Sequence, residues 1–162
     1  MPFELIQSAV FCIFQYMIRN SPLPKNIEEL LPEAYEYLRA DEDTLFAYLF
    51  GSLAREKAGP LSDVDIAVYL ADRVAFAEKK LEILGNLMNI LKTDEIDLVV
   101  LNKAPLTLRM KILESKKLIA DNAPLVRHRY ESLTMRQYFD FSFKESFILS
   151  KRFLHGRQNA HP

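Results

Sequence analysis

The sequence predicts an α+β (α/β) fold, in which a small mixed sheet is flanked by helices and followed by a C-terminal helical segment. Short apolar runs at residues 45–50, 64–70 and 96–101 have the length and the β-branched or aromatic content of strands. Over residues 72–91, apolar side chains recur at the spacing of one helical face. A long run of helical character follows at residues 124–154.

The chain length of 162 residues suits one compact domain. Within it we expect a helical extension at residues 1–40, a core at residues 41–121 and a C-terminal helical segment at residues 122–162. A net charge of −1 gives no general attraction to nucleic acid or to an anionic membrane. Cys12 is the only cysteine, which excludes an intramolecular disulfide and agrees with a cytoplasmic location.

Two helical segments are expected before the first strand. Residues 5–18 are mostly apolar but too few to span a bilayer, and no basic region precedes them. We interpret them as a buried or interface helix that ends at Pro22. Asn26 can cap a second helix over residues 26–38, although Pro32 allows two short turns instead.

The first strand is apolar along its whole length, which indicates burial on both faces. Gly51 and Ser52 form a turn directly after it. A short helix is expected to begin at this turn, with its amide dipoles directed at a bound anion. A loop at residues 57–62 then leads to the second strand.

The second strand separates its side chains by character. Val64, Ile66 and Val68 share one face and can anchor the strand in a core. Asp63 and Asp65 therefore point together to the opposite face. These two carboxylates are the first candidates for chemistry in the chain.

The third strand repeats this separation. Ile96, Leu98 and Val100 share one face, and Asp97 lies on the other face with Val99. If this strand pairs beside the second, Asp97 joins the two earlier aspartates.

The helix at residues 72–91 connects these two strands. Asp72 is a plausible N-cap. Gly85 costs the helix about 1 kcal/mol relative to alanine, so packing must offset it or a close approach must require it. A second helix at residues 106–116 and a short strand at residues 118–120 follow the third strand. The expected apolar face of the connecting helix consists of Val74, Ala77, Leu81, Leu84, Met88 and Leu91.

The C-terminal segment forms one long helix or two, and it is rich in aromatic residues. Some of them must face the core. On one interpretation, part of the aromatic surface of this segment binds a partner or a second copy of the chain. On the other, all of the aromatic residues are core or scattered surface residues. These residues are Tyr130, Tyr138, Phe139, Phe141, Phe143, Phe147 and Phe153.

The Gly-Ser turn and the three aspartates together indicate metal-assisted chemistry on a nucleoside triphosphate. Backbone N–H groups of a tight turn can bind phosphate oxygens. Converging carboxylates repel one another and favour Mg²⁺, which takes its other ligands from water and phosphate. The alternative is a surface strand with solvated aspartates after an ordinary turn.

Phe50-Gly51-Ser52, a ten-residue spacer, Ser62-Asp63-Val64-Asp65 and Ile96-Asp97-Leu98-Val99 together resemble the DNA polymerase beta-type nucleotidyltransferase superfamily. More narrowly, the chain is similar to the minimal nucleotidyltransferases (MNT), which are antitoxin partners of HEPN-domain toxins. The resemblance extends from about residue 45 to the C-terminus. The family's usual Ala-Arg-Gly after the turn is Ala54-Arg55-Glu56 here.

This resemblance implies a polymerase-beta-like nucleotidyltransferase fold and Mg²⁺-dependent transfer of AMP from ATP. The implied acceptor is a tyrosine hydroxyl on a HEPN ribonuclease toxin encoded nearby, which AMP transfer would neutralise. Asp63, Asp65 and Asp97 would be the catalytic acids and would hold two Mg²⁺ ions, with Asp97 the best candidate to accept the hydroxyl proton. The expected nucleotide-binding residues are Gly51, Ser52, Arg55 and Ser62.

Two other classes of function stay open. The protein could neutralise its partner by contact alone, although the presence of all three acids weighs against a disused site. It could instead modify a small molecule or an RNA end, but the lack of net positive charge weighs against RNA. No membrane partner is expected, and both a homodimer and a hetero-oligomer are possible.

Overall fold

The computed structural model describes residues 23–24, 26–55 and 62–156, with only the backbone described after residue 147. The expected helix at residues 5–18 and most of the expected loop at residues 57–62 lie outside these ranges. Within them, the chain forms the elements α2 (Ile27–Ala40), β1 (Thr44–Leu49), α3 (Gly51–Ala54), β2 (Val64–Leu70), α4 (Phe76–Leu91), β3 (Ile96–Val100), α5 (Leu106–Ser115), β4 (Lys117–Asp121) and α6 (Pro124–Gly156).

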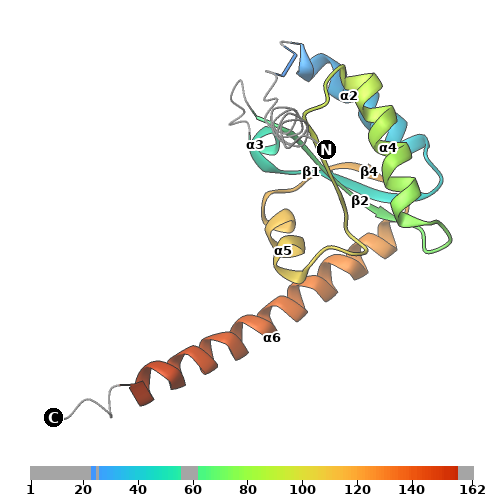
Figure 1. The fold of residues 1–162 in the computed structure, drawn as a ribbon. Coiled ribbons are helices and arrows are strands. Elements are labelled where there is room, and N and C mark those ends of the chain that lie inside the picture. Colours follow the sequence, from blue (N-terminus) through green and yellow to red (C-terminus); the bar gives the residue numbers. More distant parts are fainter. Residues whose placement is uncertain (1–22, 25, 56–61, 157–162) are drawn as a thin grey trace, which may run out of the picture.

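The strands form one four-stranded sheet in the order β3-β2-β1-β4 (Figure 1). β1 runs antiparallel to both β2 and β4, whereas β3 runs parallel to β2. The sheet is therefore mixed, as expected. The crossover connection through α4 lets β3 run in the same direction as β2. This arrangement confirms the predicted fold class.

Helices cover both faces of the sheet. One core lies under α2 and α4 and includes Leu38, Ile66 and Ile83. A second core lies under α5 and the start of α6 and includes Phe46, Ile112 and Tyr130. β1 contributes to both cores, which confirms that this strand is buried on both faces.

α2 is one continuous helix that runs through Pro32. Pro32 lies on the exposed side of α2, so the carbonyl that it leaves without a helical donor can be solvated. Asn26 holds the N-cap position, but its side chain makes no capping hydrogen bond. Its backbone carbonyl instead accepts from the N–H groups of Glu29 and Leu30 at 3.0 and 3.3 Å, so the side-chain cap predicted from the sequence is wrong.

α4 buries a different face from the one predicted, and it begins after Ala75 rather than at an Asp72 cap. The helix carries two apolar stripes, and contact with α2 and the sheet selects one of them. Leu81, which was expected in the core, is 69% exposed. Of the predicted face, only Leu91 is fully buried. The buried stripe consists of Lys79, Ile83, Leu87 and Leu91.

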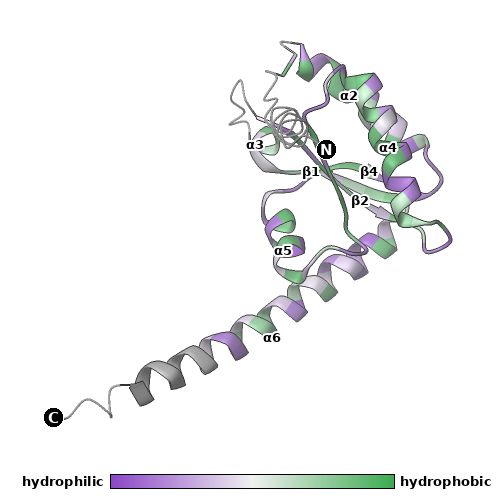
Figure 2. Cartoon of the chain, viewed as in Figure 1, coloured by the Kyte–Doolittle hydropathy of each residue, from purple (hydrophilic) through white to green (hydrophobic). Residues whose placement is uncertain are grey.

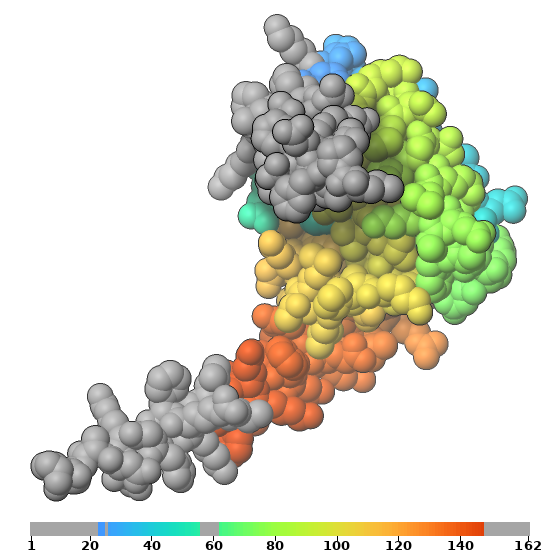
Figure 3. Space-filling view, in the orientation of Figure 1, coloured from blue at the N-terminus to red at the C-terminus, as the bar shows by residue number. Residues whose placement is uncertain are grey.

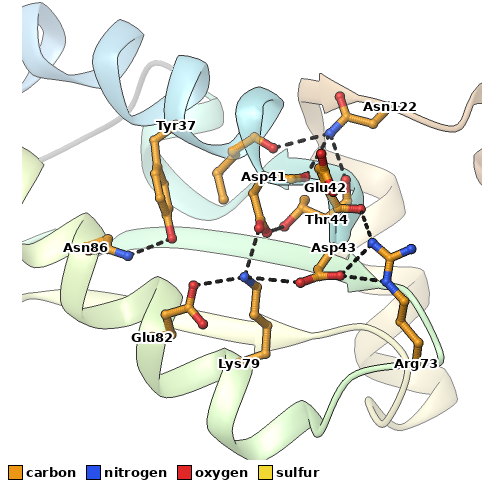
Figure 4. A network of polar contacts seen from close by, with 11 residues as sticks. Tyr37, Asp41, Glu42, Asp43, Thr44, Arg73, Lys79, Glu82, Asn86 and Asn122 are labelled. Carbon is orange, nitrogen blue, oxygen red and sulfur yellow. Dashed lines mark hydrogen bonds and ion pairs between the residues drawn. The ribbon is translucent and has the colours of Figure 1, made fainter.

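Lys79 ties α4 to the turn that precedes β1 (Figure 4). Its ammonium lies 2.8 Å from Asp41, 2.9 Å from Glu82 and 3.5 Å from Asp43. Burial alone would lower the pKa of Lys79, but hydrogen bonds to Asp41 and Glu82 hold it above its ordinary value. Lys79 therefore stays charged, and removing it would leave carboxylates without their counter-ion at the entry to β1.

Within the described residues, α6 is anchored at its beginning. Tyr48 donates a hydrogen bond of 2.6 Å to Glu131, which also forms an ion pair with Lys116. Arg127 pairs with Asp121 at the end of β4, at 2.9 Å. Beyond these contacts the helix projects away from the body of the molecule, as Figures 1 and 3 show.

The projecting part of α6 interleaves hydrophobic and hydrophilic positions (Figure 2). Phe139 is 63% and Phe143 76% exposed, so these aromatic residues do not belong to the core of this chain. None of the helices in the described part of the chain is both long enough and apolar enough to cross a membrane.

We expect Gly85→Ala to increase the free energy of unfolding by about 1 kcal/mol, because Gly85 lies within α4 and alanine has the higher helix propensity. A methyl group at this position would meet no atom within 4 Å. Urea unfolding of the two proteins measures the difference. A loss of stability would mean that the glycine is needed for packing after all.

Candidate active site

The pairing of β1 with β2 places the Gly-Ser turn against Asp65. Leu49 lies opposite Ile66, and the N–H of Phe50 donates to the carbonyl of Asp65 at 3.0 Å. Gly51 follows with a φ of +72°, in the left-handed region that favours glycine. A Cβ on Gly51 would lie 1.9 Å from the Oδ2 atom of Asp65, so no other residue fits here without movement of the acid.

α3 starts at Gly51, as predicted from the sequence. Phe50 holds the N-cap position but makes no side-chain hydrogen bond there, so its side chain leaves the first-turn amides to other partners. A pocket of about 290 Å³ opens at this turn. It is lined by Phe50, Gly51, Ser52, Arg55, Asp65, Lys111 and Ser115.

The pairing of β2 with β3 brings the second and third acids together. Asp65 and Asp97 are register partners in these parallel strands. Their strands turn Val64, Ile66 and Leu98 into the core under α2 and α4, as predicted. Both carboxylates therefore lie on the opposite face of the sheet, on the side of α5.

Asp63 and Ser62 precede β2. Asp63 is exposed and Ser62 is half-buried, and neither of them lines the pocket at the Gly-Ser turn. The structure thus gathers Gly51, Ser52, Arg55 and Asp65 at one pocket and sets Asp97 beside it.

Asp65 is the electrostatic centre of this arrangement. Burial raises its pKa to about 6, and the negative charges of Asp97 and Asp63 act in the same direction. Lys111 partly offsets these effects. A carboxyl group with this pKa is ionised at neutral pH, although the neighbouring negative charges repel it. A bound cation would relieve that repulsion.

The donor set suits a hard divalent cation, although the side chains do not already enclose one. Among the described residues, no three His, Cys, Asp or Glu side chains stand close enough together to hold a metal ion as they lie. Asp65 nevertheless experiences the charges of both other acids. Carboxylate oxygens with room for water and phosphate are the ligands that Mg²⁺ prefers, so the residues fit this ion.

Lys111 and Ser115 were not found from the sequence. Both belong to α5, which packs on the same face of the sheet as the acids. The sequence does predict this helix, but no sequence motif marks Lys111 and Ser115 as the part of the helix that lines the pocket with Gly51. Lys111 supplies a positive charge beside Asp65 on a helix that begins only after the third acid.

A family model matches the part of the chain that contains these residues. The model described as "Polymerase beta, Nucleotidyltransferase" matches residues 33–124, which is more than half of the chain. No curated protein matches the chain significantly.

Solved structures with the same fold come from toxin–antitoxin complexes. One, described as a toxin–antitoxin with AMP-PNP, aligns with a TM-score of 0.62 and 22% identity over 75% of this chain and 98% of its own. A tri-AMPylated Shewanella oneidensis HEPN toxin in complex with an MNT antitoxin aligns with a TM-score of 0.55 and 20% identity, over 79% of this chain and 96% of its own. An MntA-HepT complex aligns with a TM-score of 0.55 and 21% identity, over 80% of this chain and 99% of its own. At these identities the likeness shows the fold alone.

We expect Gly51→Ala to lower the free energy of unfolding by about 2 kcal/mol, through left-handed backbone strain and the clash with Asp65. Gly85→Ala is the matched control and should have the opposite sign. In an Asp65→Ala background, part of the cost should disappear because the clashing carboxylate is gone, whereas the backbone strain stays. Equal costs in both backgrounds would contradict the contact between Gly51 and Asp65.

We expect Asp65→Asn to stabilise the metal-free protein by about 1 kcal/mol at neutral pH, a value reduced for solvent screening. The pKa of Asp65 is about 6 in the fold and 3.8 ordinarily, so ionisation lowers wild-type stability as pH rises through this window. The variant should lack this loss. Urea unfolding in EDTA between about pH 4 and pH 7 tests the sign, and a difference that does not change with pH would contradict it.

Proposed function

Because the chain belongs to the polymerase beta nucleotidyltransferase family, we propose that it transfers AMP from ATP to a hydroxyl group of a partner protein. The observation that carries this proposal is the contact of the Gly51 turn with Asp65, beside Asp97 on the next strand. It combines a place for phosphate with a crowded pair of carboxylates. We further propose that the acceptor is a tyrosine of a HEPN-domain toxin, for which this protein is the antitoxin.

The solved structures support the choice of acceptor. They include a complex with AMP-PNP and a complex in which a HEPN toxin is tri-AMPylated. A partner that brings its own hydroxyl completes the reaction.

The pocket at the Gly-Ser turn is the proposed site for the triphosphate. Backbone amides of the first turn of α3 face anions favourably, and Ser52 adds a hydroxyl group. Arg55 and Lys111 line the same pocket and can neutralise phosphate charge. Ser62 is proposed to orient the loop before Asp63.

Asp63, Asp65 and Asp97 are the proposed ligands of two Mg²⁺ ions. When bound, Mg²⁺ neutralises phosphate charge and makes the α-phosphorus more open to attack. The strand pairing holds Asp65 beside Asp97, where their negative charges repel one another. A bound cation relieves this repulsion, so the arrangement favours metal binding.

Asp97 is the proposed proton acceptor. It is exposed on the outer strand of the sheet, where a hydroxyl from another molecule can reach it. The acceptor oxygen forms a bond to the α-phosphorus while the bond from that phosphorus to the β-phosphate oxygen breaks. Pyrophosphate leaves, and the proton of the hydroxyl passes to Asp97.

The test is incubation with ATP labelled at the α-phosphate, Mg²⁺ and the product of the adjacent gene, which we expect to be the HEPN-domain protein. Label should appear on the HEPN protein, and EDTA should abolish it. Asp97→Asn should reduce the rate about 100-fold or more, because the variant loses both the proton acceptor and one proposed metal ligand. Asp140→Asn, on the exposed part of α6, is the matched control.

Two outcomes would contradict this function. If no label is transferred and Asp65→Asn still neutralises the toxin, the protein acts by contact. If label enters RNA or a small molecule and never the HEPN protein, the acceptor class is wrong. Loss of label with EDTA alone would not discriminate between acceptors, so the labelled product must be identified by mass spectrometry.

A further inference from the structure

A second cavity lies on the other side of the acids, along the outer edge of β3. It has a volume of about 530 Å³ and extends from Asp97 past Leu98 and Val100 to Ala104. The first turn of α4 forms the opposite wall, with Phe76 and Ala77. The groove is thus mainly apolar and ends at one of the proposed catalytic acids.

The walls of this groove are fixed by the fold. The N–H of Leu101 donates to the carbonyl of Val68 at 2.8 Å, which continues the pairing of β3 with β2. The side-chain amide of Asn102 bonds to both the N–H and the carbonyl of Leu70, each at 2.9 Å. The Nζ atom of Lys103 lies 5.4 Å from the centroid of the Phe76 ring. A cavity with such walls is preformed.

The edge of β3 offers backbone groups to a ligand. In the described part of the chain, β3 pairs only with β2. Because alternate residues of a parallel strand point their N–H and C=O groups to opposite sides, Leu98 and Val100 direct theirs away from β2. The carbonyl of Val100 accepts from the N–H of Lys103 at 3.2 Å, so the edge offers chiefly the backbone groups of Leu98 and the N–H of Val100. An extended peptide can add to such an edge through main-chain hydrogen bonds.

The groove and the pocket at the Gly-Ser turn lie on opposite sides of Asp65 and Asp97. The pocket sits where β1 ends beside Asp65, whereas the groove lies outside β3. Neighbouring strands are about 4.8 Å apart, so the two cavities approach one another across the width of a single strand. Phosphoryl transfer places the attacking and leaving oxygens roughly in line. A leaving pyrophosphate at Gly51 therefore puts the attacking hydroxyl on the side of Asp97.

We propose that this groove binds an extended segment of the acceptor protein and delivers its hydroxyl to Asp97. The inference rests on the proposed transferase function and identifies where the acceptor docks. The segment has apolar side chains that fit against Phe76 and Ala77. It also carries an acidic residue, because Lys80 and Lys103 give the groove two positive charges. A mainly apolar cavity with two lysines favours a peptide over an RNA strand, whose binding depends on repeated phosphate contacts.

Ala77→Trp tests the proposal by filling the groove from an exposed helix position, with Ala40→Trp at the exposed end of α2 as the matched control. The probes are AMP-PNP with Mg²⁺ and the product of the adjacent gene, which we expect to be the HEPN-domain protein. We expect Ala77→Trp to raise the KM for the HEPN protein by about tenfold or more, while its Kd for AMP-PNP is unchanged. Lys80→Glu should also raise this KM, and Lys117→Glu, on β4, should not.

The outcomes separate this inference from the function on which it rests. If wild-type protein labels no HEPN protein, the proposed function fails. If the wild type labels it and both Ala77→Trp and Lys80→Glu keep the wild-type KM, the groove is not the docking site. Label on RNA that Ala77→Trp abolishes would overturn the protein acceptor. Should Ala77→Trp not fold, Lys80→Glu alone decides.

Discussion

The register of β2 between two neighbours of opposite direction determines the candidate site. Antiparallel pairing with β1 delivers Gly51 against the carboxylate of Asp65, closely enough that only glycine fits. Parallel pairing with β3 sets Asp97 directly beside the same acid. A slip of one residue in either pairing would turn an aspartate into the core and a valine or isoleucine onto the site face. The pocket at the Gly-Ser turn, the placement of Asp65 beside Asp97 and the groove along β3 all depend on this one alignment.

Packing keeps the alignment despite the unfavourable charge at Asp65. Val64, Ile66 and Val68 are buried under α2 and α4, and a shift of β2 would expose them. The Lys79 network fixes the entry to β1, so that strand cannot slide along β2 without separating buried charges. The repulsion among the acids is thus sustained by two hydrophobic cores on either side of the sheet, which is how folded proteins hold locally unfavourable functional groups.

Much of this could be predicted from the sequence because the decisive signals are local. Alternation along the strands predicted which face Asp65 and Asp97 share, and the Gly-Ser turn predicted α3. Contacts between distant segments could not be predicted. Both stripes of α4 are apolar, so only the sheet decides that Ile83 rather than Leu81 is buried. Lys111 reaches the pocket through the packing of α5, for which the chain carries no motif. How Arg55 and Ser62 act stays a prediction.

The most direct test of the central claim is a crystal structure with Mn²⁺ and an ATP analogue that cannot be cleaved between the α- and β-phosphates. We expect anomalous density for Mn²⁺ between Asp65 and Asp97, the β- and γ-phosphates at Gly51 and Ser52, and the α-phosphorus open towards the outer edge of β3. Metal bound away from both aspartates, or a nucleotide whose phosphates lie outside the pocket at the Gly-Ser turn, would contradict it.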